Sequence, residues 1–275
     1  MTQTTGLKRN PIDKYYTTPA IVKQCLEYVE QYVSIEGRDL CIEPSAGNGA
    51  FINDIKTLFS LYHFYDIDPQ HTDIERMDYL QLDETTLNIN QYRKIHCIGN
   101  PPFGRQSSLA IQFIKKSASY CDSISFILPK SFKKDSLKKH FPISFHLEYE
   151  YDIPDNSFLV DNTIYDVPCV FQIWIKKDVP RLMPKKLEPV GYQFVEKEKQ
   201  PTVSVRRVGV YAGKIDREID AKSKQSHYFI QFDKDLSDAT IKKLSDIDYI
   251  NKSNTVGPRS ISKQELIKEF NRVLR

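Results

Sequence analysis

The residues Asn100, Pro101, Pro102 and Phe103 have the chemistry needed to hold a planar aromatic amine. They directly follow the largely apolar run 95–98, so we expect them to leave the carboxyl end of a buried strand, where open α/β sheets bind ligands. The prolines stiffen the loop and remove two backbone donors. The Asn100 side chain and the Pro101 carbonyl can accept N–H groups, and the Phe103 ring offers a flat face. For these four residues alone, a proline-rich turn after a core strand is an equally good interpretation.

A second candidate site lies upstream, between an apolar segment at 39–43 and a predicted helix at 48–59. A strand, a glycine-containing loop and a helix N-terminus form a nucleotide-type site, because glycine lets the backbone approach a ligand. The acidic Glu43 and only two glycines favour a ligand without a pyrophosphate, and a carboxylate there can hold an ammonium group. The candidate residues of this loop are Glu43, Pro44, Ser45, Ala46, Gly47, Gly49 and Phe51.

Acidic residues follow the next predicted strand, at 61–65. Asp66 and Asp68 lie about 20 residues beyond the glycine loop, where Rossmann-like folds bind ribose hydroxyls. Asp78 and Tyr79 come after them. Single acids at such positions are more often exposed turn residues, but their order behind the loop favours a nucleoside-binding function.

Together the motifs resemble those of the S-adenosylmethionine-dependent N6-adenine DNA methyltransferases of the permuted class. The resemblance is carried by Asn-Pro-Pro-Phe at 100–103, by the form E-P-x-A-G-x-G-x-F at 43–51 and by Tyr-Tyr-Thr-Thr-Pro at 15–19. It covers roughly residues 13–177 and keeps the motif order of that family. It implies an α/β, Rossmann-like methyltransferase fold with a mostly parallel sheet of roughly seven strands.

The resemblance also assigns roles to the residues at the methyl-transfer end of the site. In this family the segment after the strand acts on the acceptor amine, which makes Asn100, Pro101, Pro102 and Phe103 the catalytic residues. The cofactor is S-adenosyl-L-methionine, held by the glycine loop. The segment before the first helix would close over the methionine end of the cofactor through Tyr16, Thr17 and Thr18. On the residues alone, this segment is simply a cap for a helix with Pro19 at its first position.

The adenosine end of the cofactor and the second face of the acceptor base are assigned in the same way. Asp66 would bind the ribose, with Ile67 packing on the cofactor's adenine and Asp68 left as a turn residue. Asp78 would accept from the adenine amine, with Tyr79 against the ring. Phe158, in the loop between two later strands, would stack on a flipped base opposite Phe103, although a loop phenylalanine is as often a local core plug.

The charge of the chain is unevenly distributed. Residues 1–179 hold 19 Lys and Arg against 23 Asp and Glu, a net charge of −4, and residues 180–275 hold 20 against 13, a net charge of +7. We therefore expect a cofactor-binding catalytic domain at 1–179 and a small basic α+β domain at 180–275 that recognises nucleic acid. A lysine-rich solvated surface would give the same count.

In the basic region, cations lie beside an aromatic residue and glycines. Arg206, Arg207 and Lys214 are the candidates for contact with the nucleic-acid substrate, since such a surface can hold phosphates and stack bases. An edge strand protected by charged residues is the competing interpretation. The capping-box pattern of Ser262 and Glu265 predicts a final helix.

The sequence also indicates what to exclude. No long apolar run predicts a signal peptide or a membrane span, so we expect an intracellular protein, cytoplasmic or nuclear. The five cysteines form no CxxC and the six histidines no metal-binding pair, so we expect neither metal nor disulfides. DNA is the expected partner. Methylation of RNA, methylation of protein glutamine and a catalytically silent nucleic-acid-binding subunit remain alternatives, and the oligomeric state and recognition sequence stay open.

Overall fold

The computed structural model describes residues 15–275, which divide into two compact units. The first unit extends to Met183 and the second comprises Pro184–Arg275. Each unit has its own core and is described separately. Among the described residues, none of the helices is long and apolar enough to cross a bilayer.

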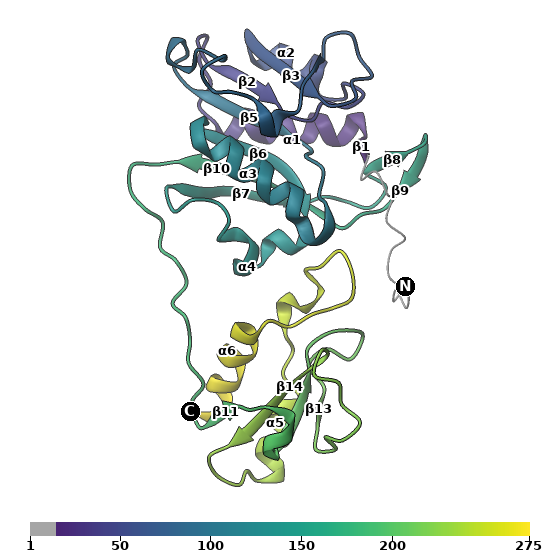
Figure 1. Ribbon diagram of the computed structural model, residues 1–275, viewed down its shortest axis with the longest axis vertical. Coiled ribbons are helices and arrows are strands. Elements are labelled where there is room, and N and C mark those ends of the chain that lie inside the picture. Colours follow the sequence, from purple (N-terminus) through teal and green to yellow (C-terminus); the bar gives the residue numbers. More distant parts are fainter. Residues whose placement is uncertain (1–14) are drawn as a thin grey trace. The chain divides into compact units, whose positions relative to one another are not determined.

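A seven-stranded sheet forms the centre of the first unit (Figure 1). Its order is β4-β3-β2-β5-β6-β10-β7, and the pairs from β4 to β6 are parallel. β10 runs antiparallel to both of its neighbours. The predicted Rossmann-like α/β fold with a mostly parallel seven-stranded sheet is thus confirmed. The strands are β2 (Leu40–Glu43), β3 (Leu61–Asp66), β4 (Glu75–Arg76), β5 (Ile95–Gly99), β6 (Ser123–Pro129), β7 (Phe145–Asp152) and β10 (Cys169–Lys176).

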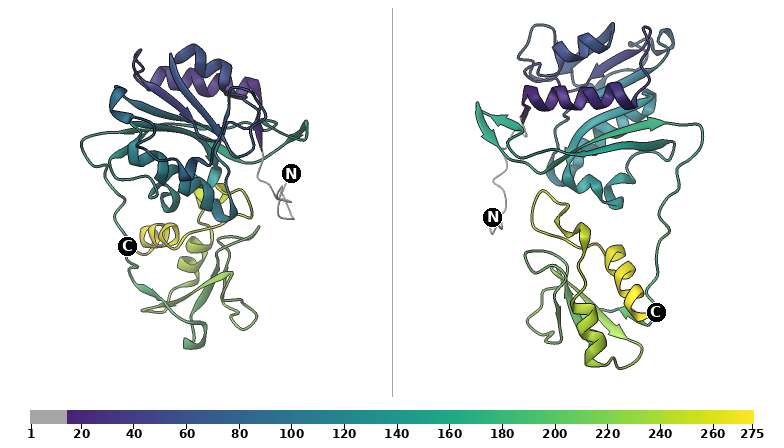
Figure 2. Two further views of the ribbon diagram at one scale, coloured as in Figure 1. Left: turned by 45° about the horizontal axis from the view of Figure 1, so that its top comes forward. Right: turned by 180° about the vertical axis from the view of Figure 1, so that it is seen from behind.

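Helices cover both faces of this sheet. α1 (Pro19–Tyr32) and α3 (Ser108–Tyr120) lie on opposite faces, as Figures 1 and 2 show. α3 buries Ala110, Phe113 and Ile114 in the main core, beside residues of β2, β5 and β6. The two shorter helices are α2 (Ile52–Leu58) and α4 (Asp135–Lys138). The predicted helix at 48–59 therefore begins later, because turns at 44–51 first carry the chain around the cavity described below.

The start of α1 follows the sequence pattern. The residues it buries are spaced three and four apart, as one face of an amphipathic helix requires. Thr18 is the N-cap residue with Pro19 at the first helical position, as expected, although the Thr18 side chain makes no capping hydrogen bond. The helix is therefore held by its buried face and by the proline more than by its cap.

A separate three-stranded sheet joins the start of the described chain to the region between β7 and β10. β1 (Tyr16–Thr17) pairs antiparallel with β8 (Phe158–Val160), which pairs with β9 (Thr163–Tyr165). The Thr18 N–H also donates to the Ser157 carbonyl, at 3.0 Å. These bonds fix the segment before α1 by main-chain pairing.

The second unit is a small α+β domain, as predicted. Its antiparallel sheet has the order β11-β14-β12-β13, and helices α5 and α6 complete it. Ser262 and Glu265 form the predicted capping box at the start of α6. The elements are β11 (Tyr192–Phe194), β12 (Val203–Arg206), β13 (Ile215–Asp216), β14 (His227–Phe232), α5 (Asp238–Ser245) and α6 (Lys263–Leu274).

Candidate cofactor and acceptor site

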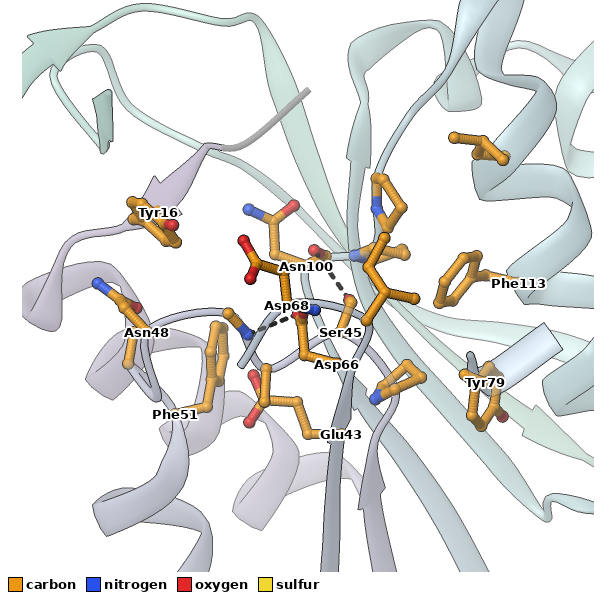
Figure 3. A pocket seen from close by; sticks show the side chains of 18 of the residues that line it. Tyr16, Glu43, Ser45, Asn48, Phe51, Asp66, Asp68, Tyr79, Asn100 and Phe113 are labelled. Carbon is orange, nitrogen blue, oxygen red and sulfur yellow. Dashed lines mark hydrogen bonds between the residues drawn. The ribbon is translucent and has the colours of Figure 1, made fainter. Parts of the chain in front are cut away.

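A cavity of about 310 Å³ opens at the carboxyl ends of β2, β3 and β5 (Figure 3). It is lined by the glycine loop, by Asp66 and by the first three residues of the Asn-Pro-Pro-Phe segment. Ser45 and Asn100 are 55 residues apart in sequence, yet the Ser45 hydroxyl donates to the Asn100 main-chain carbonyl at 3.3 Å. The structure therefore brings the two motifs into one site.

Gly47 allows the loop after β2 to approach the cavity closely. Its φ is +55°, and a Cβ atom there would lie 3.0 Å from the Tyr16 ring. The Gly47 N–H donates to Asp66 Oδ2 at 2.8 Å, and the Asp68 N–H donates to Asp66 Oδ1 at 2.8 Å. Two main-chain donors thus orient the Asp66 carboxylate, whose remaining lone pairs can accept from hydroxyl groups of a ligand.

Glu43, the predicted partner of an ammonium group, is a buried carboxyl in the cavity wall. Its side chain is 2% exposed, and among the described residues nothing donates a hydrogen bond to its buried Oε2. Burial raises the pKa of the Glu43 carboxyl well above its usual range, and the nearby Asp66 carboxylate raises it further. A Cβ atom on Gly99 would come within 3.2 Å of Glu43 Cγ, so a glycine is needed beside it. A cation bound here would supply the missing partner.

These observations fit S-adenosyl-L-methionine. Its ammonium group would meet Glu43 and its ribose hydroxyls would meet Asp66, while Ile67 remains 67% exposed at the cavity and is available to an adenine ring. Asp78 lines the cavity too, and its carboxylate accepts from the Leu80 N–H at 3.0 Å. The carboxylate acceptors and the volume therefore agree with a nucleoside that carries an amino-acid side chain.

Tyr79 supports the cavity floor and does not extend into it. It is 1% exposed, and its ring stacks on Phe113 with centroids 5.5 Å apart. Its hydroxyl is 2.8 Å from the Ser117 hydroxyl and accepts from Tyr120 at 2.6 Å. Tyr79 lines the cavity, as its predicted contact with the cofactor's adenine requires, and α3 holds it in place through these two hydroxyls.

The acceptor loop begins at Asn100, which is half-buried. Its side-chain nitrogen donates to the Tyr15 carbonyl at 3.0 Å and to Thr17 Oγ1 at 3.2 Å. Pro101 is buried and Pro102 is half-buried, and both line the cavity. The start of this loop therefore lies beside the glycine loop, on the wall of the same cavity.

Two predicted base-stacking residues do not offer open faces in this structure. Phe103 is 6% exposed, and Tyr15 stacks on it with centroids 6.0 Å apart. Phe158 is 1% exposed in β8, opposite Thr17, which fits the core-plug interpretation, and its stacking on a flipped base stays a prediction. Tyr165, which also stacks on Tyr15 at 5.6 Å, is the partly exposed aromatic residue of the same hairpin.

Most other predicted cofactor residues line the cavity, with two exceptions. Thr18 is paired to Ser157 through its main chain, and Gly49 shapes the turn before α2, where a Cβ atom would lie 2.8 Å from the Ile52 side chain. Neither residue lines the cavity itself, but each is next in sequence to residues that do. Tyr15, Asn48 and Asp68 line the cavity as well, although the motifs that contain or adjoin them assigned them no cofactor contact. Met77, Leu109 and Phe113 also line it and lie outside every motif, so the sequence did not identify them.

The candidate substrate contacts of the second unit differ in exposure. Arg206 is the last residue of β12, and its Nε donates to the carbonyl of the nearby Val208 at 2.9 Å. Arg207 is exposed, with its guanidinium 5.4 Å from the centre of the Tyr228 ring, and Lys214 is exposed as well. Their contact with nucleic acid stays a prediction.

We found no cluster of metal-ligating side chains in the part of the chain that the structure describes. No group of three or more His, Cys, Asp or Glu side chains there could hold an ion. The five cysteines are buried free thiols.

Several solved structures with a similar chain path are described as methyltransferases. A putative RNA methyltransferase from Pyrococcus horikoshii aligns over 63% of this chain and 92% of its own, with 15% identity and a TM-score of 0.46. A putative class I S-adenosylmethionine-dependent methyltransferase from Listeria monocytogenes aligns over 66% of both chains, with 14% identity and a TM-score of 0.44. The N-methyltransferase NodS from Bradyrhizobium japonicum, in complex with S-adenosyl-L-homocysteine, aligns over 62% of this chain and 90% of its own, with 10% identity and a TM-score of 0.40.

No protein-family model matches the sequence, and no curated protein matches it either. Because the identities of the three structures lie below 25% and their TM-scores below 0.5, we draw the functional conclusion from the residues of the site.

Proposed function

We propose that this protein is an S-adenosylmethionine-dependent methyltransferase that acts on the N6 amine of adenine in DNA, after the base has left its stack. The observation that carries the proposal is that one cavity is lined both by the buried Glu43, whose Oε2 accepts no hydrogen bond from the described residues, and by Asn100 and Pro101. A cation site and a pair of amine acceptors at one opening are what transfer from a charged cofactor to a planar amine needs.

When bound, the cofactor would supply a methyl group attached to a positively charged sulfur. The sulfur would keep the bonding electron pair when the methyl group leaves. The residues of the protein must activate the acceptor amine and align it with the methyl group. The N6 lone pair is delocalised into the adenine ring, so the amine is a poor nucleophile. Hydrogen bonds from the amine to Asn100 Oδ1 and the Pro101 carbonyl draw it toward tetrahedral geometry and direct the lone pair at the methyl carbon.

The same acceptors stabilise the positive charge that develops on the nitrogen, in a partly buried place where electrostatic contacts are strong. After the N–C bond has formed, the amine releases one proton to solvent. Alignment of the amine with the methyl group contributes the rest of the rate. A strong general base is not needed, because the methylated amine is acidic until it loses that proton.

DNA is favoured over RNA by the order of the motifs, and the basic second unit supports a polyanionic substrate. For duplex DNA, extrusion of the base costs a few kcal/mol, and base–aromatic stacking of about 1–3 kcal/mol for each ring would offset it. RNA remains the second candidate, because the acceptor loop contacts the base and not the sugar.

Methyl transfer from isotopically labelled cofactor to duplex DNA, single-stranded DNA and RNA of matched sequence tests the proposal. We expect incorporation into adenine-containing DNA and none with the Asn100→Ala variant. Incorporation into RNA alone would replace DNA by RNA as the substrate. Cofactor binding without transfer to any nucleic acid would refute the proposal.

A further inference from the structure

Asn100 is held by a segment that lies more than eighty residues earlier in the chain. Its Nδ2 donates to the Tyr15 carbonyl, 85 residues away, at 3.0 Å and to Thr17 Oγ1, 83 residues away, at 3.2 Å. Both hydrogen-bond partners belong to the segment that forms β1 or directly precedes it. The acceptor loop of the site therefore depends on this segment for its side-chain geometry.

These contacts settle which way the Asn100 amide faces. A main-chain carbonyl can only accept a hydrogen bond, so the amide nitrogen must face Tyr15 and the amide oxygen must face away from it. The Thr17 hydroxyl oxygen takes the second N–H. With both N–H groups engaged on the β1 side, Oδ1 is the part of the side chain left to accept from a substrate (Figure 3).

Thr17 is itself rigidly placed. It is 5% exposed, and its strand pairs with β8, where Phe158 lies directly opposite. The next residue, Thr18, is fixed to the Ser157 carbonyl at 3.0 Å. Because Thr17 is already ordered by burial and strand pairing, its hydrogen bond to Asn100 costs little additional conformational entropy. The Thr17 hydroxyl can therefore hold the Asn100 side chain in one rotamer.

We propose that Thr17 is a positioning residue that, with the Tyr15 carbonyl, orients the Asn100 amide so that Oδ1 faces the acceptor amine. This inference rests on the proposed function and adds to it a role for Thr17 besides the predicted contact with the cofactor. Without the Thr17 oxygen, the Tyr15 carbonyl is the one remaining partner of the amide nitrogen among the described residues, so rotation of the amide becomes easier. Rotation would present an N–H donor to the amine, which would repel the N–H groups of the substrate and misalign its lone pair.

Two substitutions separate this role from packing. Thr17→Val keeps the shape of the side chain and removes the hydroxyl, whereas Thr17→Ser keeps the hydroxyl and loses a methyl group. We expect Thr17→Val to lower kcat about 10- to 100-fold, since small misplacements of reacting groups cost this much. Thr17→Ser should restore kcat to within a few-fold of the wild type. In both variants the melting temperature should stay close to the wild-type value, and the cofactor Kd should change far less than kcat does.

The matched control is Thr163→Val. It makes the same substitution at an exposed position in β9, which belongs to the same small sheet. It should leave kcat unchanged. Equal loss of kcat in the Val and Ser variants, together with a lower melting temperature, would show a structural role and overturn the proposal. A raised cofactor Kd with an intact kcat would make Thr17 a cofactor ligand only. Wild-type activity in Thr17→Val would also refute the positioning role, whereas an inactive wild type would refute the proposed function itself.

Discussion

Replacing Glu43 with Gln should stabilise the ligand-free protein and at the same time weaken cofactor binding. Glu43 is 2% exposed, and its Oε2 has no donor among the described residues. Gln keeps the size of the side chain and removes the capacity for charge. The ligand-free protein then no longer buries an ionisable group beside Asp66, and the cofactor's ammonium group loses its counter-charge.

Two magnitudes follow from this environment. A buried polar atom without a partner costs about 1–3 kcal/mol, and because Gln still places polar atoms there we expect a gain of about 1 kcal/mol. For a domain of this size that gain raises the melting temperature by about 2–4 °C. A hydrogen bond to a charged group contributes about 1.5–3 kcal/mol, so the cofactor Kd should rise about 10- to 150-fold.

The pH dependence has a defined sign. Burial, with the Asp66 carboxylate adding to it, raises the pKa of the Glu43 carboxyl well above its ordinary value of 4.5 in the ligand-free fold. The folded protein therefore binds more protons than the unfolded chain, and this group's contribution to stability falls as pH rises from 4.5 toward the raised pKa. An ammonium ligand favours the ionised form, so cofactor binding should release a proton and tighten with pH over the same interval.

Thermal unfolding without ligand and calorimetric titration with S-adenosyl-L-homocysteine measure both effects. Titration in two buffers with different ionisation enthalpies counts the released protons. Asp68→Asn is the control, because it removes an exposed carboxylate from the same cavity. It should change neither the number of protons released nor, beyond a few-fold, the Kd. An unchanged Kd in Glu43→Gln, or a wild type that releases no proton, would refute this assignment of Glu43.

Three further substitutions test other parts of the site. Asn100→Ala should reduce turnover below detection, a loss of at least about 10²- to 10³-fold, and leave the cofactor Kd, measured by calorimetry, near the wild-type value. Tyr15→Ala should lower the KM for nucleic acid about 5-fold, since the Tyr15–Phe103 pair, of about 0.5–1.5 kcal/mol, no longer competes for the Phe103 face; a raised KM would contradict this. Gly47→Ala should weaken cofactor binding about 5- to 30-fold, because alanine at φ +55° costs about 1–2 kcal/mol, whereas Gly37→Ala, with nothing within 4 Å, should bind normally.

The sheet and the glycine loop could be predicted because local patterns specify them. Short apolar strands alternate with loops and helices along the first unit, which is the pattern of a parallel sheet. Once β2 and β5 are neighbours, their carboxyl ends bring Glu43 and Asn100 to the same edge. The cavity then follows from topology, and its location needed no knowledge of side-chain packing.

Side-chain contacts between distant segments could not be predicted in this way. Phe158 belongs to a hairpin whose register with β1 decides that its ring is buried, and no period in the sequence encodes that register. Tyr15 covers Phe103 for the same reason. The bond from Asn100 to Thr17 joins residues 83 positions apart, so it appears only once β1 has paired with β8.

The identity of the methylated nucleoside tests the central claim most directly. After incubation of the protein with cofactor and DNA that contains all four bases, the DNA is digested to nucleosides and analysed by mass spectrometry. Presentation of an exocyclic adenine nitrogen by Asn100 and Pro101 predicts N6-methyladenine, which should disappear in Asn100→Ala. A methyl group on a ring carbon, or a product that Asn100→Ala still forms at the wild-type rate, would contradict the account.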